Sequence, residues 1–201
     1  MSFRPFMVKE ADYRLSSKNS ALIIVDMQND GFKFHGEGLR KVILRLQKFL
    51  ERARRANLNI IHVQTLRDNK SLQTIIYGTK SNLIEGKWEA KLVEELRPKR
   101  GESVIDKETH DCFFKTTMDK TLKELNLKPG KSTIITTGIG ANNCLYHAVI
   151  GFHVRQYEVL VPLDCTHSSK PMGMKFLKWQ MNQGAYNFNV KLTSSSNIIF
   201  D

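Results

Sequence analysis

Hydrophobic residues follow two patterns along this chain, and the two patterns alternate. Near-continuous apolar runs, typical of strands buried on both faces of a sheet, predict strands over 21–26, 59–66, 103–107, 132–138 and 158–164. Apolar residues also recur at helical spacing, most clearly over 39–57, where the repeat comprises Val42, Ile43, Leu46, Phe49, Leu50 and Ala53. Further helices are predicted over 88–98, 116–127, 142–156 and 172–184, and an irregular loop over 67–85.

This alternation predicts the fold class. Strands that alternate with helices form βαβ units, which build a parallel sheet with helices on both faces. We therefore expect an α/β protein: a three-layer αβα sandwich around a mainly parallel, doubly wound sheet. The 201 residues suit a single domain over 1–201, with a polar lead-in over 1–19.

Chemically distinctive residues stand at or just beyond the ends of three predicted strands. Asp26, Lys107 and Gly138 each end a predicted strand, and the stretch TTGIGANNCLYHA places Cys144 just beyond the third. Parallel strands bring their carboxyl ends, where ligands bind, to one edge of the sheet. We therefore expect the carboxylate, the ammonium and the thiol to meet there.

Such a group can perform acyl transfer. A helix N-terminus and a nearby ammonium both stabilise a thiolate, and a carboxylate can hold the ammonium and move a proton. N–H groups of the glycine turn GIGANNC would form an oxyanion hole. Each residue also has a purely structural interpretation: a turn-capping aspartate, a solvated lysine and a small buried cysteine.

Composition narrows the class of protein. Lys and Arg number 31 against 20 Asp and Glu, for a net charge of +11, but the basic residues are scattered and follow no nucleic-acid motif. Three cysteines at irregular spacing argue against a disulfide framework, and there is no CxxC pair. No signal peptide or membrane-length apolar run is found, so we expect a soluble cytoplasmic protein without a membrane or specific nucleic-acid partner.

The segments ALIIVDMQND, VIDKETHDCFF and TTGIGANNCLYHA together resemble the isochorismatase-like cysteine hydrolase superfamily. The similarity runs from about Ala21 to Asp164 and is strongest to the ureidoacrylate and N-carbamoylsarcosine amidohydrolase branch. It implies that Asp26 takes the thiol proton, Lys107 stabilises the thiolate and Cys144 attacks. It also implies a non-proline cis peptide at Ile139–Gly140, with the N–H groups of Gly140 and Cys144 as the oxyanion hole.

The resemblance extends to the substrate and the pocket. It implies a small-molecule amide, carbamoyl or ureido substrate, release of ammonia through a thioester, no cofactor, and a homodimer or homotetramer. Gln28 and Asn29 match the family's DxQND segment, although Asn29 also suits a turn cap. The other candidate pocket residues are Phe32, Trp88, Phe113, Asn143 and Tyr146. Core packing is the favoured alternative for the aromatic residues other than Trp88.

Three alternatives stay open. The first is a nicotinamidase. It is less favoured than the carbamoyl or ureido amidohydrolase because the family's metal-binding Asp-x-His motif is missing from RDNKSLQT after the second strand, and we predict no metal. The second is a catalytically silent ligand- or protein-binding relative, since Ala141 and Ala148 stand where relatives often carry threonine. A basic nucleic-acid-binding protein is the third and rests on charge alone. His110 is close enough in sequence to Lys107 to reach a ligand, but we assign it no role.

Overall fold

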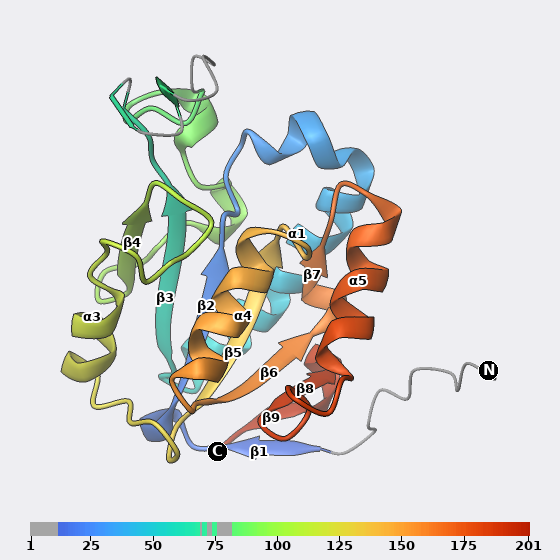
Figure 1. Ribbon diagram of the computed structural model, residues 1–201. Coiled ribbons are helices and arrows are strands. Elements are labelled where there is room, and N and C mark those ends of the chain that lie inside the picture. The colour runs from blue at the N-terminus through green and yellow to red at the C-terminus, as the bar shows by residue number, and fades with distance from the viewer. Residues whose placement is uncertain (1–11, 69, 72–73, 76–81) are drawn as a thin grey trace, which may run out of the picture.

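The computed structural model describes residues 12–68, 70–71, 74–75 and 82–201. Part of the predicted loop 67–85 and most of the lead-in 1–19 therefore lie outside the described residues. Figure 1 shows the arrangement of the helices and strands.

A seven-stranded sheet forms the centre of the molecule, and all its strand pairs are parallel. The strand order is β4-β3-β2-β5-β6-β8, with β7 beside β5. The strands are β2 (Ser20–Val25), β3 (Asn59–Thr65), β4 (Ser103–Lys107), β5 (Thr133–Ile139), β6 (Glu158–Pro162), β7 (Thr166–His167) and β8 (Val190–Thr193). The predicted parallel, doubly wound sheet is confirmed, although β7 and β8 were not expected.

Helices cover both faces of this sheet. They are α1 (Gly31–Arg55), α3 (Met118–Glu124), α4 (Cys144–Val154) and α5 (Pro171–Met181). In Figure 1, α3, α4 and α5 lie in front of the sheet and α1 lies behind it. Each face has its own apolar core, because alternate residues of β2 point to opposite sides: Ile23 packs under α4, and Ile24 packs under α1. The three-layer αβα architecture is thus confirmed.

Two segments depart from the sequence prediction. Helix α1 begins at Gly31, well before residue 39, and is kinked at Gly36, whose φ is +52°. The predicted helix over 88–98 is wrong: the segment forms two 3₁₀ turns, Trp88–Ala90 and Glu94–Leu96, separated by extended chain. Between these turns its backbone pairs with the segment after β2, since the N–H of Val93 donates to the carbonyl of Met27 at 2.9 Å.

A small second sheet lies at the opposite end of the molecule from the carboxyl edge. Strand β1 (Tyr13–Leu15), within the expected polar lead-in, pairs in parallel with β9 (Ile198–Phe200). The guanidinium of Arg52 on α1 donates to the carbonyl oxygens of Ser195 and Ile198. These bonds fasten the C-terminal segment to the end of α1.

The order in which the chain adds strands to the sheet reverses between β2 and β5. The chain runs outward from β2 through β3 to β4, and outward on the other side from β5 through β6 to β8. Gly138 permits the close approach of the two central strands: its φ is +110°, and a Cβ there would lie 2.2 Å from the carbonyl oxygen of Val25. Doubly wound sheets bind ligands at the carboxyl ends of the two strands that flank such a point.

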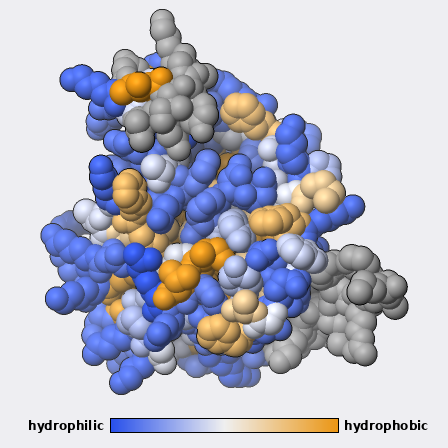
Figure 2. Space-filling view, in the orientation of Figure 1, coloured by the Kyte–Doolittle hydropathy of each residue, from blue (hydrophilic) through white to orange (hydrophobic). Residues whose placement is uncertain are grey.

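The surface shows no single large apolar area from this side. Figure 2 shows a mainly hydrophilic face with separate hydrophobic patches. Among the described residues, no helix is long and apolar enough to cross a membrane.

Candidate active site

The carboxyl edge of the sheet brings the three predicted catalytic residues together. Asp26 directly follows β2, Lys107 is the last residue of β4, and Cys144 is the first residue of α4. The ammonium Nζ of Lys107 lies 2.8 Å from Oδ2 of Asp26. The Cys144 thiol lies close enough to both side chains for their charges to shift its pKa. The sheet therefore positions a carboxylate, an ammonium and a thiol as one group.

The Lys107 side chain is fully buried, yet each of its three protons has an acceptor. Besides Asp26, the ammonium donates to Oγ1 of Thr65 at 2.7 Å and to the carbonyl oxygen of Thr109 at 3.1 Å. Burial by itself lowers the pKa of Lys107, but Asp26 and Cys144 together raise it by more than burial lowers it. The net pKa is therefore above its ordinary value. Lys107 is a fixed positive charge beside the thiol.

Thr65 is a functional residue that the sequence interpretation missed. It ends β3 and is paired in register with Lys107 on β4. Its hydroxyl donates to Oδ1 of Asp26 at 3.1 Å while accepting from Lys107. The rule that found Asp26 and Lys107, a polar residue at the carboxyl end of a buried strand, applies equally to Thr65.

Asp26 is held in an uncommon backbone conformation. Its φ is +51°, in the left-handed region that aspartate and asparagine tolerate better than most residues. Its N–H donates to the carbonyl of Val63 at 2.8 Å, and its carboxylate accepts from Thr65 and Lys107. Strained residues of this kind concentrate at functional sites, where surrounding contacts maintain them.

Cys144 is protonated in this arrangement. Burial and the neighbouring Asp26 carboxylate raise the pKa of its thiol to about 12, and Lys107 only partly opposes them. A thiol is a poor nucleophile, so its proton has to leave as the sulfur attacks. The site therefore needs a proton acceptor in contact with Sγ.

The loop before Cys144 differs from the prediction. The described residues contain no cis peptide bond, so the expected cis bond at Ile139–Gly140 is wrong; the chain turns instead through φ +82° at Gly140 with a trans peptide. The Gly140 N–H donates to the carbonyl of His167 at 3.2 Å and is therefore already used. The Cys144 N–H has no acceptor within the described part of the chain. Of the two donors predicted for an oxyanion hole, only Cys144 is free here.

The side chains of Gln28 and Asn29 bond the backbone of segments next to the site. The Gln28 side chain is 3% exposed and bonds Thr65 twice, accepting from its N–H at 2.8 Å and donating to its carbonyl at 2.9 Å. It also donates to the carbonyl of Ala90 at 2.8 Å, and Asn29 donates to that of Trp88 at 2.9 Å. Both amides thus tie the 3₁₀ segment to the end of the sheet.

The predicted pocket residues have different environments. Phe113 is 7% exposed and packs edge-to-face on Phe152 in the core, which agrees with the core-packing alternative. Tyr146 packs on Phe176. Phe32 is partly buried against the core under α1, Trp88 is 58% exposed, and Asn143 is exposed immediately before the nucleophile. A role in the pocket stays a prediction for Asn143, Trp88, Phe32 and Tyr146.

His110 contacts the Cys144 thiol directly. Its Nδ1 lies 3.2 Å from Sγ of Cys144, and its ring stacks on that of His147. The residue belongs to the irregular loop after β4, where no periodicity indicates which side chains face the site. The sequence offered only the closeness of His110 to Lys107 along the chain, which was not enough to assign it a role.

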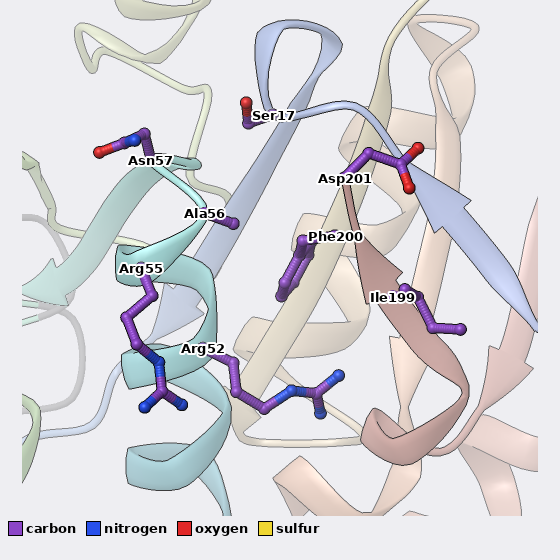
Figure 3. Close-up of a pocket in the computed structure, with 8 residues that line it drawn as sticks. All are labelled: Ser17, Arg52, Arg55, Ala56, Asn57, Ile199, Phe200 and Asp201. Atoms are coloured by element: carbon purple, nitrogen blue, oxygen red, sulfur yellow. The ribbon is translucent and has the colours of Figure 1, made fainter.

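A separate cavity of about 650 Å³ lies away from this group. It is at the amino end of the strands, and Figure 3 shows its lining residues coming from the end of α1 and from the C-terminal segment. They are Ser17, Arg52, Arg55, Ala56, Asn57, Ile199, Phe200 and Asp201. None of the three predicted catalytic residues lines it, so we place the chemistry at the carboxyl edge.

Comparison with known proteins identifies the family of this chain. A family model, the isochorismatase domain, matches residues 20–194. The chain belongs to the isochorismatase family. The resemblance inferred from its three motifs is thereby confirmed, and so, at the level of the family, is the prediction of a hydrolase that acts on carbon–nitrogen bonds other than peptide bonds.

Individual members of the isochorismatase family support the same grouping. Ureidoacrylate amidohydrolase RutB of Stutzerimonas stutzeri (strain A1501) is 28% identical over 186 residues, covering 78% of this chain and 73% of that protein. Among solved structures, N-carbamoylsarcosine amidase from Thermoplasma acidophilum matches with a TM-score of 0.71 at 22% identity, covering 88% of this chain and 96% of that one. An isochorismatase-like hydrolase from Alkaliphilus metalliredigens has a TM-score of 0.75 at 22% identity, covering 89% and 96%. These two structures establish the fold.

Proposed function

We propose that this protein is a cysteine-dependent amidohydrolase that releases ammonia from a small amide, carbamoyl or ureido compound. The observation that carries the proposal is the Asp26–Lys107 ion pair at the carboxyl edge, whose charges act on the Cys144 thiol, beside the point where the strand order reverses. The relatives named above as ureidoacrylate amidohydrolase and N-carbamoylsarcosine amidase favour a carbamoyl or ureido substrate.

The first half-reaction forms a thioester. The Cys144 thiol attacks the substrate carbonyl and loses its proton to Asp26, whose carboxylate is already oriented by Thr65 and Lys107. Negative charge develops on the carbonyl oxygen, and the free N–H of Cys144 is placed at the helix N-terminus, where it can donate to that oxygen. The tetrahedral intermediate collapses as the leaving nitrogen takes the proton, and ammonia departs.

The second half-reaction returns the enzyme to its starting state. Asp26 takes a proton from a water molecule, which attacks the thioester carbonyl, and the Cys144 thiol leaves with a proton. Lys107 does not change its charge, because its ammonium is held by three acceptors throughout. Its role is to keep positive charge beside the sulfur as the sulfur passes through its anionic form.

Ammonia release tests this proposal. Purified protein is incubated with a panel of ureido acids, N-carbamoyl amino acids, nicotinamide, biuret and oxamate, together with a Cys144→Ala variant. Cys165→Ala is the matched control, because Cys165 is buried under α1 on the other side of the sheet. We expect release from at least one compound, retained by Cys165→Ala and abolished by Cys144→Ala.

The outcome also separates the alternatives. Activity confined to nicotinamide would make the protein a nicotinamidase. No release from any compound would favour the catalytically silent relative. The homodimer or homotetramer and the cytoplasmic location stay predictions.

A further inference from the structure

The loop that carries His110 is held in place by its backbone. The Lys107 ammonium donates to the carbonyl of Thr109, and the Asp111 carboxylate accepts from the N–H of Phe113 at 2.8 Å. The guanidinium of Arg67, from the segment after β3, donates to the carbonyl of Glu108 at 3.3 Å. These bonds fix both sides of the loop, so the 3.2 Å contact between His110 Nδ1 and Cys144 Sγ joins two anchored elements.

Charged and titratable groups surround His110 on every side. They are Lys107 on β4, Asp26 after β2, Arg67 after β3, and Cys144 and His147 on α4. Burial lowers the pKa of His110 first, followed by the positive charge of Lys107 and by His147 and Arg67, while Asp26 opposes them. The imidazole is therefore neutral at neutral pH, and with its proton on Nε2 it presents the Nδ1 lone pair to the thiol.

We propose that His110 is a second proton acceptor for Cys144, beside Asp26, and carries the thiol proton to the leaving nitrogen. This rests on the proposed amidohydrolase function and adds a catalytic residue to it. The observation that carries it is the direct contact between a ring nitrogen and the reacting sulfur. Both oxygens of Asp26 already accept a hydrogen bond, from Thr65 and Lys107, whereas Nδ1 of His110 contacts the thiol.

The proton balance of this step is complete. As the S–C bond forms, the S–H bond breaks, its proton moves to Nδ1, and the carbonyl electron pair moves onto oxygen. As the C–N bond breaks, its electron pair stays on nitrogen, which takes the proton from Nδ1. Ammonia leaves, the thioester remains on Cys144, and His110 is neutral again.

Two substitutions at position 110 distinguish proton transfer from simple positioning. His110→Asn puts an amide near the place of Nδ1, so the thiol keeps a hydrogen-bond acceptor but loses a base. His110→Ala leaves a space that added imidazole can enter. The control is His153→Gln, since His153 lies near the C-terminal end of α4 and its Nδ1 bonds Oδ1 of Asn189 instead of the thiol.

With a substrate from the panel, we expect His110→Asn to lower kcat by about 100-fold, the lower range for a general base, with little change in KM. The acid limb of the kcat/KM profile should shift in this variant, and imidazole should restore part of kcat in His110→Ala but none in Cys144→Ala. His153→Gln should keep its activity. Wild-type kcat in His110→Asn, or no rescue of His110→Ala, would overturn the role of His110 and leave the amidohydrolase proposal intact.

A measurement without substrate keeps the inference testable if no compound is hydrolysed. Alkylation of Cys144 by iodoacetamide is followed by peptide mass across pH 5–9. The wild-type rate should rise with the titration of an imidazole, and this rise should be missing in His110→Asn and present in His153→Gln. Identical profiles in wild type and His110→Asn would refute the proton transfer.

Discussion

Replacing Lys107 by Met should destabilise the protein severely, even though methionine is apolar and similar in length. The Lys107 side chain has no exposed surface and that of Asp26 is 11% exposed, so the substitution leaves a buried carboxylate without its counter-ion. Thr65 also loses the donor that its hydroxyl accepts from. The expected cost is therefore the cost of stranding polar groups, and not the loss of packing.

The structure sets the size of this effect. Two unit charges separated by 2.8 Å attract by about 6 kcal/mol at an effective dielectric constant near 20. Much of this attraction only offsets the desolvation of the two groups, and breaking a buried pair by removing one partner typically costs about 3–5 kcal/mol. We expect Lys107→Met to lower the free energy of unfolding by about that amount.

A double variant separates the stranded charge from the lost contacts. Asp26→Asn removes the negative charge while keeping a residue type that tolerates φ +51°. Because replacing both members of a buried pair is often close to neutral, Asp26→Asn combined with Lys107→Met should recover most of the loss. The assay is urea unfolding at pH 7 of the wild type, both single variants and the double variant.

The result that would refute this reasoning is additivity. If the double variant is less stable than Lys107→Met alone, by the full cost of Asp26→Asn, the two side chains do not interact energetically. The contact at 2.8 Å would then contribute nothing beyond packing, and Lys107 would need another explanation for its burial.

Two further predictions concern stability. Burial alone would raise the pKa of Glu102, but hydrogen bonds from Arg54, a backbone N–H and His62 hold it at about 2, below the ordinary 4.5. This shift stabilises the folded state above pH 4.5, and the stabilisation is lost as the pH falls toward about 2. Glu102→Gln should therefore reduce the acid decline of the unfolding free energy by about 3 kcal/mol at most. An unchanged slope of the unfolding free energy against pH would contradict this. Gly138→Ala should prevent folding, since its Cβ would collide with a backbone carbonyl of β2, whereas Gly101→Ala, with φ +94° but open space, should cost only about 1–2 kcal/mol of strain. Equal soluble yields and urea midpoints for the two glycine variants would show that the close strand approach is unimportant.

The sheet was predictable because its strands are buried on both faces. Such strands need long apolar runs, and β2, β3 and β5 have them. The positions of Asp26 and Lys107 followed from the same rule, since polar residues at the ends of parallel strands reach one edge. Strand β8, VKLT, lacks such a run because two of its residues are only partly buried.

Elements whose structure depends on long-range contacts were not predictable in this way. The segment 88–98 has the composition of a helix, but its backbone groups bond the chain after β2. Gln28 looked like a pocket residue because of its motif, and only the structure shows its amide fully used in bracing β3 and Ala90. His110 lies in a loop, where sequence spacing says nothing about direction.

The thioester mechanism is tested most directly by the mass of the enzyme during turnover. An active member of the substrate panel is mixed with excess enzyme, and the reaction is quenched in acid within the first turnover. The mass of the peptide that contains Cys144 is then measured by mass spectrometry. We expect an adduct on Cys144 whose mass equals that of the substrate less ammonia, present in the wild type and missing in Cys144→Ala. Ammonia release without any adduct at Cys144, or with activity kept in Cys144→Ala, would contradict a thioester mechanism.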